Sequence, residues 1–286
     1  MVCDLLSALL LSLRPLFLAK VSLMSSFNHT LIGQFVEELY SANSLWERFY
    51  IYQQYVNRLG FHSASYTFIP SIQLDQSLPP IFLYTNEFPK GFLQQYTEQN
   101  LARHDFTLRL ARDYKVAPSL NWREPLDWRE HEVSGALLPQ EVAVIELARV
   151  DYGIINAVSI PTMMSEAGVA GMSIISHEND CLFEKLKAKS LPTLLSCSQI
   201  FHDMNYASSD LNYTFLMPFI QNLRPKEIQI LRYLASGKNL KAIEDSTGIS
   251  YGYASNLLNE LRARLGGISR DKLMYLIGAV KLFNLN

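Results

Sequence analysis

The sequence contains little cysteine. Only Cys3, Cys181 and Cys197 occur among its 286 residues, and neither a CxxC spacing nor a histidine cluster accompanies them. A disulfide framework needs paired cysteines, and a structural zinc site needs Cys and His ligands at short spacings. The sequence therefore excludes small disulfide-bonded and zinc-binding domains, and we expect a cytoplasmic protein with no metal and no cofactor.

A long apolar run is also lacking. The opening stretch MVCDLLSALLLSLRPLFLAK is interrupted by Arg14 and Pro15 before it reaches the ~20 residues of a membrane span. Asp4 precedes its apolar part and no basic segment leads it, which distinguishes it from a secretory signal peptide. We therefore expect no membrane association. We interpret residues 1–26 as an extra amphipathic segment, with Met24 as a candidate for the natural start.

Motifs of catalysis and of phosphate binding are missing too. The sequence has no GxSxG nucleophile motif, and Glu98 and Glu130 form no evident pair of acid and base. It lacks the Gly-rich first turn of a dinucleotide-binding fold and the Asp and Lys series of a receiver domain. We therefore predict a binding protein without catalytic residues. The alternative, an enzyme that modifies a small signal, predicts product formation by the purified protein.

Charge is divided unevenly along the chain. From Leu223 to the end there are ten Lys and Arg against five Asp and Glu, so this part carries +5 and the remainder −7. A basic module joined to an acidic one is expected when only the basic module binds a polyanion. The chain is also long enough for two domains. We therefore expect a domain boundary close to residue 223.

Helical and strand-like patterns alternate in blocks in the acidic part. Apolar residues recur at helical spacing over residues 31–59, strand-like runs occupy 65–72, 81–86, 153–161 and 170–176, and residues 92–114 and 139–151 again favour helices. These patterns predict one mixed domain over residues 27–202, with a sheet flanked by helices. The polar stretch 203–222, which contains Pro218, is predicted to be an irregular linker.

Residues 223–286 follow the order helix, turn, helix. Pro225 stands at a first-turn position, and Gly237 ends the first helical pattern. Gly248 supplies the tight turn after the second helix, and Ser250 is a suitable N-cap for the third. This order predicts a DNA-binding helix-turn-helix.

The third helix of this part has an apolar and a polar face. Its inward stripe consists of Ala254, Leu257, Leu258, Leu261 and Leu265, and its outer face of Tyr253, Ser255, Asn256, Asn259 and Arg262. Asn can form paired bonds to adenine, and Arg can bond guanine or phosphate, so this face suits the major groove. Lys238, Lys241 and Arg264 flank it and are expected to contact phosphates. We therefore predict double-stranded DNA as a partner.

The same segment resembles the LuxR-type helix-turn-helix. The resemblance rests on Glu227, Ile228, Leu231, Gly237, Ile243, Gly248, Ile249, Ser250, Leu261, Leu265 and Gly266. The sequence departs from the family pattern at Tyr253, Ala254 and Ser255, which leaves the operator sequence open. The resemblance implies an all-α domain of four helices. Its last helix, Asp271 to Phe283, would help form a homodimer on a roughly palindromic site.

The acidic domain resembles the autoinducer-binding domain of LuxR-family quorum-sensing regulators. The resemblance rests on Tyr96, Asp105, Trp122, Gly153, Pro161 and Ser173. It implies an α+β fold, with an N-terminal α/β/α sandwich around an antiparallel sheet, and a small-molecule ligand of the N-acyl homoserine lactone class. In the roles that it implies, Asp105 accepts from the ligand amide, Tyr96 and Ser173 bind the acyl carbonyl, and Trp122 packs on the lactone ring. The predicted ligand-binding residues are Tyr84, Phe88, Phe92, Tyr96, Asp105, Trp122, Ala157 and Ser173.

Three positions depart from the family pattern. Phe92 replaces a Trp whose indole N–H donates to the lactone carbonyl, Phe106 replaces a Pro, and Ala157 replaces a Gly. The loss of one buried hydrogen bond weakens the binding of a lactone by ~1 to 3 kcal/mol. A different head group, as in regulators without a cognate synthase, is therefore one alternative. A regulator that needs no ligand and acts through mixed dimers or constitutive DNA binding is another.

Overall fold

The computed structural model describes residues 30–71, 80–116, 122–280, 282 and 283. The acidic part contains a first helix over 30–41, α2 (Leu45–Arg58), β1 (Ser63–Pro70), β2 (Leu83–Tyr84), α4 (Lys90–Glu98), η1 (Leu101–His104), α5 (Phe106–Val116), β3 (Leu126–Asp127), α6 (Trp128–Ser134), α7 (Pro139–Tyr152), β4 (Asn156–Ser165), β5 (Gly168–Ser176), α8 (Asp180–Tyr206) and α9 (Ser209–Gln221). The basic part contains α10 (Pro225–Ala235), η2 (Leu240–Ala242), α11 (Ile243–Thr247), α12 (Tyr251–Arg264) and α13 (Arg270–Ala279). The predicted N-terminal segment 1–26 lies outside the described residues.

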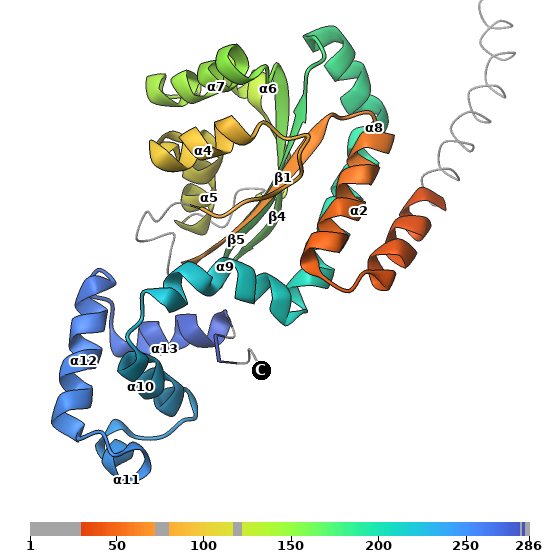
Figure 1. The fold of residues 1–286 in the computed structure, drawn as a ribbon. Coiled ribbons are helices and arrows are strands. Elements are labelled where there is room, and N and C mark those ends of the chain that lie inside the picture. Colours follow the sequence, from red (N-terminus) through yellow and green to blue (C-terminus); the bar gives the residue numbers. More distant parts are fainter. Residues whose placement is uncertain (1–29, 72–79, 117–121, 281, 284–286) are drawn as a thin grey trace, which may run out of the picture.

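A single antiparallel sheet forms the middle layer of the acidic part. Its strand order is β2-β1-β5-β4-β3. Helices α4 to α7 cover one face, and α2 and α8 cover the other, with the first helix on the outer side of α2 (Figure 1). This arrangement confirms the predicted α+β fold with an α/β/α sandwich. The predicted strands and the predicted helical pair before Gly60 are present as well.

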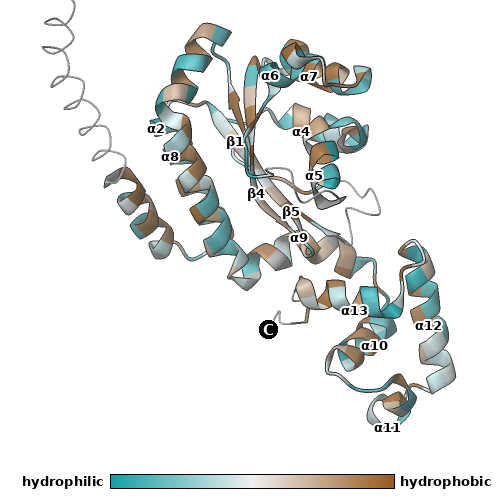
Figure 2. Cartoon of the chain, turned by 180° about the vertical axis from the view of Figure 1, so that it is seen from behind, coloured by the Kyte–Doolittle hydropathy of each residue, from teal (hydrophilic) through white to brown (hydrophobic). Residues whose placement is uncertain are grey.

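Successive residues of each strand face opposite helical layers, because side chains alternate along a strand. On β5, Met172 and Ile174 belong to the large core next to α2 and α8. Ser173 and Ile175, between and after them, line the space under α4 to α7. The strand therefore supplies apolar side chains to the core on one side and a mixed surface to the other. Figure 2 shows hydrophobic residues along the strands between the two helical layers.

The large core is rich in aromatic rings. Tyr66 on β1 packs against Phe201 on α8 and Phe215 on α9, with ring centroids 5.3 and 5.7 Å apart. The buried hydroxyl of Tyr66 forms a hydrogen bond with His202 Nδ1 at 2.8 Å. Such pairs fix the helices on the sheet because large rings lose much apolar surface on burial and the polar tip finds a partner. Within the described ranges, no helix is both long enough and apolar enough to cross a bilayer.

We expect the protein to lose stability in mild acid because of His202. Its side chain is 2% exposed, and burial lowers its pKa from 6.5 to about 4. The unfolded chain therefore binds a proton near pH 6.5 that the folded chain does not bind until about pH 4. This difference destabilises the fold progressively over that range, by about 3 kcal/mol at its acid end. Urea unfolding between pH 7 and pH 4 measures it.

The matched variant His202→Asn keeps an acceptor for Tyr66 but has no titrating ring. We expect it to be less stable at pH 7 and to show a smaller fall in unfolding free energy between pH 6.5 and pH 4. Equal falls in the variant and the wild type would contradict the assignment to this histidine.

The segment expected to be an irregular linker is mainly helical, so that expectation is wrong. Helix α8 continues to Tyr206, and α9 begins at Ser209. The reason is apolar spacing within α9: Leu211, Phe215, Leu216 and Phe219 are buried. Burial of this face against the core stabilises the helix in spite of its polar neighbours.

The basic part forms four helices in the predicted order, next to the lower end of the sheet domain (Figure 1). Pro225 is the first residue of α10, and Gly248 ends α11 in the left-handed conformation with φ 68°. The Ser250 hydroxyl accepts from the Tyr253 N–H as the N-cap of α12. These three local predictions are confirmed. The last helix ends at Ala279, earlier than the predicted Phe283.

Candidate functional site

A pocket lies between the sheet and helices α4 to α7, with an empty volume of about 540 Å³ that includes space open to solvent. Its walls are formed by Ser65, Phe82, Phe88, Phe92, Leu93, Tyr96, His104, Asp105, Phe106, Trp128, Glu141, Val144, Ile145, Ile154, Ser173 and Ile175. Most of these side chains are apolar, and a few polar groups stand among them. This composition is typical of a site for a small organic ligand. We call it the head pocket.

Asp105 is the central polar group of the head pocket. It lies in extended conformation between η1 and α5. Its Oδ1 accepts from the Thr107 N–H at 2.8 Å and from the Thr107 hydroxyl at 2.6 Å, and its Oδ2 accepts from the Tyr96 hydroxyl at 2.7 Å. A carboxylate offers about four lone-pair positions, so one remains for a further donor. Three protein donors thus orient the group and leave it able to accept from a ligand.

Tyr96 is committed to Asp105 in this arrangement. Its ring is buried, and burial together with the negative charge of Asp105 raises the pKa of the phenol well above 10. The phenol therefore stays protonated near neutral pH, and its single O–H donates to the carboxylate. Tyr96 can accept from a ligand, but it can donate to the ligand carbonyl only after it leaves Asp105.

Trp128 is a pocket residue that sequence reasoning missed. It opens α6, whose N-cap Asp127 accepts from the Glu130 N–H. The Trp128 side chain lines the head pocket with 9% of its surface exposed, and its indole Nε1–H has no acceptor among the described residues. A buried donor without a partner destabilises the fold unless something satisfies it. The sequence did offer one signal: Asp127 is a suitable N-cap, which indicates that a helix begins at Trp128.

Glu141 and Arg109 join α7 to α5 at the edge of the head pocket. The guanidinium donates to both carboxylate oxygens, from Nε at 2.6 Å and from Nη2 at 3.0 Å, and the Leu138 N–H donates to Oε2 at 2.8 Å. Burial alone would raise the pKa of Glu141, but these donors hold it below its usual value. Glu141 is therefore ionised and paired with a cationic side chain, whereas the three donors to Asp105 are neutral groups.

The head pocket brings together five of the eight predicted ligand residues. Phe88, Phe92, Tyr96, Asp105 and Ser173 line it. Tyr84, Trp122 and Ala157 do not. Tyr84 and Ala157 belong to the hydrophobic cluster behind the pocket wall, and Trp122 is half-buried with the Arg123 guanidinium 5.0 Å from its ring centroid.

A second pocket, with an empty volume of about 550 Å³, lies on the same face of the sheet beside α5. Ser173 lines both pockets, so they meet at β5. Its walls are formed by Thr67, Thr107, Leu108, Ala111, Leu126, Ser159, Ile160, Pro161, Met163, Met164, Val169, Ala170, Gly171, Met172 and Ser173. The lining is again mostly apolar, and we call this space the tail pocket.

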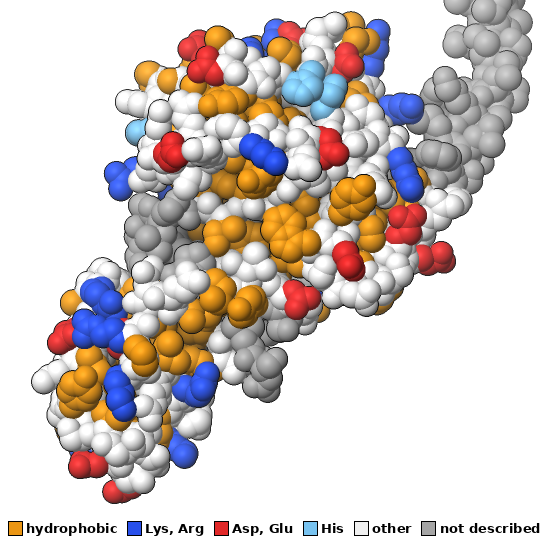
Figure 3. All heavy atoms as spheres, in the orientation of Figure 1, with side chains coloured by type: hydrophobic (Ala, Val, Ile, Leu, Met, Phe, Trp, Pro, Cys, Tyr) orange, Lys and Arg blue, Asp and Glu red, His pale blue; other side chains and the backbone are white. Residues whose placement is uncertain are grey.

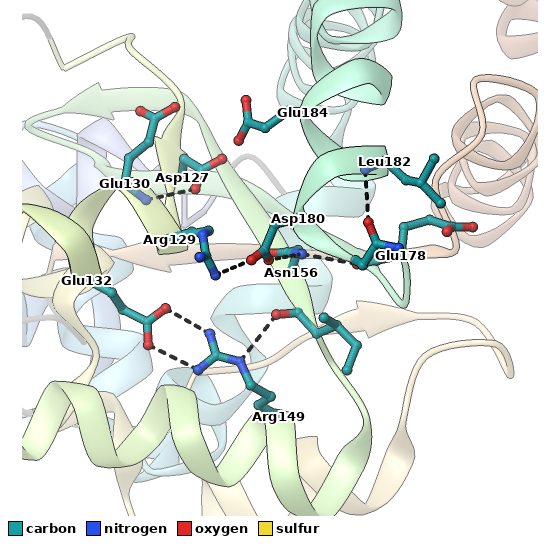
Figure 4. A network of polar contacts seen from close by, with 12 residues as sticks. Asp127, Arg129, Glu130, Glu132, Arg149, Asn156, Glu178, Asp180, Leu182 and Glu184 are labelled. Carbon is teal, nitrogen blue, oxygen red and sulfur yellow. Dashed lines mark hydrogen bonds and ion pairs between the residues drawn. The ribbon is translucent and has the colours of Figure 1, made fainter.

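Asp127, Glu130 and Glu184 place carboxylate oxygens close together, as a metal site would (Figure 4). The centre of this cluster is filled by the ammonium group of Lys187. It forms an ion pair with Asp127 and lies 3.1 Å from Glu130 Oε1 and 2.8 Å from Glu184 Oε1. Burial would lower the pKa of Lys187, but the three carboxylates hold it above its usual value. The charged ammonium offsets one of the three negative charges and occupies the place that a metal cation would take.

The outer face of α12 is open to solvent. Tyr253, Asn256 and Asn259 are exposed, and Ser255 is half-buried. Lys238 and Lys241 are exposed just before and within η2, which packs against α12. Figure 3 shows several Lys and Arg side chains on the visible side of the C-terminal helices, with acidic side chains at their lower end.

The two arginines of α12 are engaged within the domain. Arg264 Nη2 lies 2.7 Å from both carboxylate oxygens of Glu227, which is 1% exposed. Arg262 donates from Nε to the Ile268 carbonyl at 2.7 Å and from Nη1 to Asn259 Oδ1 at 3.2 Å. Both side chains therefore have fixed positions, and part of their donor capacity is used internally.

Comparisons with known proteins agree with the resemblance of the larger domain. Residues 45–204 match the family described as autoinducer binding domain. Escherichia coli SdiA is 18% identical with a TM-score of 0.47, over 90% of this chain and 98% of that chain. SdiA in complex with octanoyl-rac-glycerol is 17% identical with a TM-score of 0.45, over 89% and 94%. The N-acylhomoserine lactone dependent LuxR-family transcription factor CepR2 from Burkholderia cenocepacia is 12% identical with a TM-score of 0.45, over 64% and 99%. A search among curated proteins gave no match.

Proposed function

The chain belongs to the family of proteins with an autoinducer-binding domain, and from this premise we propose that it is a transcription regulator that binds an N-acyl homoserine lactone and, as a homodimer, promoter DNA. The observation that supports this ligand class is the orientation of the Asp105 carboxylate by three donors in a largely apolar pocket. The family consists of regulators and not of enzymes, which agrees with the expected lack of catalysis.

The polar groups of the head pocket suit the amide and the lactone of such a ligand. The free lone-pair position of Asp105 accepts the amide N–H, which forms a strong bond because the acceptor is charged. Ser173 offers a hydroxyl to the acyl carbonyl, since the Tyr96 O–H already donates to Asp105. The unpartnered indole N–H of Trp128 is a donor for the lactone carbonyl and would compensate for Phe92, which has none. The acyl chain continues into the apolar tail pocket.

The exposed face of α12 supports the DNA half of the proposal. Asn256 and Asn259 offer amides for base edges, and Tyr253 offers an amphipathic ring next to them. Lys238 and Lys241 are exposed ammonium groups suited to phosphates, whereas Arg264 would contribute only the donors that Glu227 leaves free. The function is tested by selecting DNA from a random library with the purified chain, with and without lactone. A lactone-dependent enrichment of a palindromic sequence is expected, and no enrichment under either condition would overturn the DNA half.

Replacing Asn256 by alanine is expected to weaken binding to the selected sequence by about 5- to 150-fold, because a paired base contact contributes about 1 to 3 kcal/mol. Weak, salt-sensitive binding to unrelated DNA should be unchanged, since phosphate contacts supply it. Fluorescence anisotropy on both DNAs measures the two effects. Gln221→Ala, in the exposed last turn of α9, is the control. Equal losses on both DNAs would argue against base recognition by Asn256.

A further inference from the structure

Three serines form a row across the middle of the sheet. Ser65 on β1 pairs with Ser173 on β5, and Ser173 pairs with Ser159 on β4. Neighbouring strands lie about 4.8 Å apart, so the row crosses the sheet in two steps of that length. Ser65 and Ser173 line the head pocket, and Ser173 and Ser159 line the tail pocket. The row therefore connects the two spaces.

Ser159 presents a buried hydroxyl that nothing satisfies. Its side chain is 8% exposed, and its Oγ has no hydrogen-bond partner among the described residues. The two threonine hydroxyls of the tail pocket wall differ, because Thr67 donates to the Ile81 carbonyl and Thr107 donates to Asp105. Buried polar groups in folded proteins are nearly always paired. An unpaired hydroxyl in a pocket wall is explained by a ligand group that pairs with it.

We propose that the ligand has an oxygen on the third carbon of its acyl chain and that Ser159 binds this oxygen. The inference rests on the proposed function and specifies its ligand class. With the acyl carbonyl at Ser173, the chain enters the tail pocket, and its third carbon lies two bonds further along. Ser159 stands one strand beyond Ser173 in that direction. A serine hydroxyl donates to a 3-oxo group, and it both donates to and accepts from a 3-hydroxy group.

The test is calorimetric titration of the full chain with three lactones of equal length. They are N-octanoyl, N-(3-oxooctanoyl) and N-(3-hydroxyoctanoyl) homoserine lactone. Wild type is expected to bind at least one oxygenated lactone about 3- to 10-fold more tightly than the octanoyl compound, the ratio that one neutral hydrogen bond provides. The comparison of the two oxygenated lactones shows whether the 3-oxo or the 3-hydroxy group is preferred.

Ser159→Ala should remove this preference without weakening the binding of the octanoyl compound. Ser196→Ala, at a half-buried serine of α8 whose hydroxyl donates to the Pro192 carbonyl outside both pockets, is the matched control and should keep the wild-type ratios. Without ligand, Ser159→Ala should melt at or above the wild-type temperature, because the lost hydroxyl had no partner. A lower melting temperature would show that the hydroxyl has a protein partner and would overturn the proposal.

The outcomes separate this inference from the function on which it rests. Equal affinity of wild type for all three lactones, or a preference that survives in Ser159→Ala, overturns the role of Ser159 and leaves lactone binding in place. Failure of wild type to bind any lactone overturns the proposed ligand class, and the inference with it.

Discussion

Replacing Asp105 by alanine is expected to weaken lactone binding by about 10- to 100-fold, because the amide N–H loses a charged acceptor. Glu141 also lines the head pocket, but Arg109 and the Leu138 N–H already engage it. At about 100 times the wild-type Kd, a lactone stabilises wild type by about 2.7 kcal/mol. After a 100-fold loss of affinity, the same lactone concentration provides less than about 0.5 kcal/mol of stabilisation. Thermal melting with and without lactone measures the difference.

Two further variants separate ligand binding from folding. Asp105→Asn keeps the shape of the side chain and an oxygen for Thr107, but it removes the charge, so it should fold normally and also bind weakly. Asp113→Ala, which loses only an exposed ion pair with Arg109 3.7 Å away, should keep the full melting shift. An undiminished shift in both Asp105 variants would refute the role of this carboxylate.

Replacing Lys187 by methionine is expected to destabilise the fold by about 3 to 5 kcal/mol, because it leaves a buried charge without its partner. The charge is that of Asp127, whose side chain is only 5% exposed and pairs with the ammonium. Methionine keeps an apolar stem of similar length, so the loss is mainly electrostatic. Urea unfolding of the two proteins measures it.

A double variant tests the cause of this loss. Asp127→Asn removes the buried charge and keeps an oxygen for the Glu130 N–H, so Lys187→Met combined with Asp127→Asn should recover about 2 kcal/mol or more relative to Lys187→Met alone. Glu130→Ala removes a carboxylate that is 69% exposed and should cost no more than about 1 kcal/mol. A double variant less stable than Lys187→Met would contradict the ion-pair explanation.

The Lys187 ion pair matters for the pocket because of its position. Asp127 ends β3 and caps α6, and the next residue is Trp128 in the pocket wall. Lys187 comes from α8, which packs on β4 from the opposite side of the sheet. The same α8 leads into α9 and then into the C-terminal helices (Figure 1). The structure thus joins a pocket wall to α8, which leads through α9 into the C-terminal helices.

The helix-turn-helix could be predicted from the sequence in detail because its signals are local. Pro225, Gly248 and Ser250 act within one turn of their own positions, so their residue types determine where helices begin and end. β3 was missed because it has only two residues and owes its existence to pairing with β4. Helix α9 was missed because polar residues and Pro218 concealed a buried apolar face.

The pocket could be predicted only in part. Tyr96 and Asp105 are nine residues apart, and a short connection through η1 brings them into contact. Trp128 reaches the same pocket through the pairing of β3 with β4, which no local pattern reveals. Asp127, the ion-pair partner of Lys187, is 60 residues away in sequence. The row of three serines depends on the register of three strands. Long-range pairing of this kind follows from the fold and not from spacing.

Binding of a lactone beside Asp105 is tested most directly by mass spectrometry of the full chain purified from cells supplied with a mixture of lactones. A ligand held by Asp105 and the apolar walls of the head pocket should survive purification, so wild type is expected to carry one lactone in near-equimolar amount, and Asp105→Ala prepared in parallel should carry little or none. Wild-type protein free of any lactone, or equal amounts in the two proteins, would contradict the account.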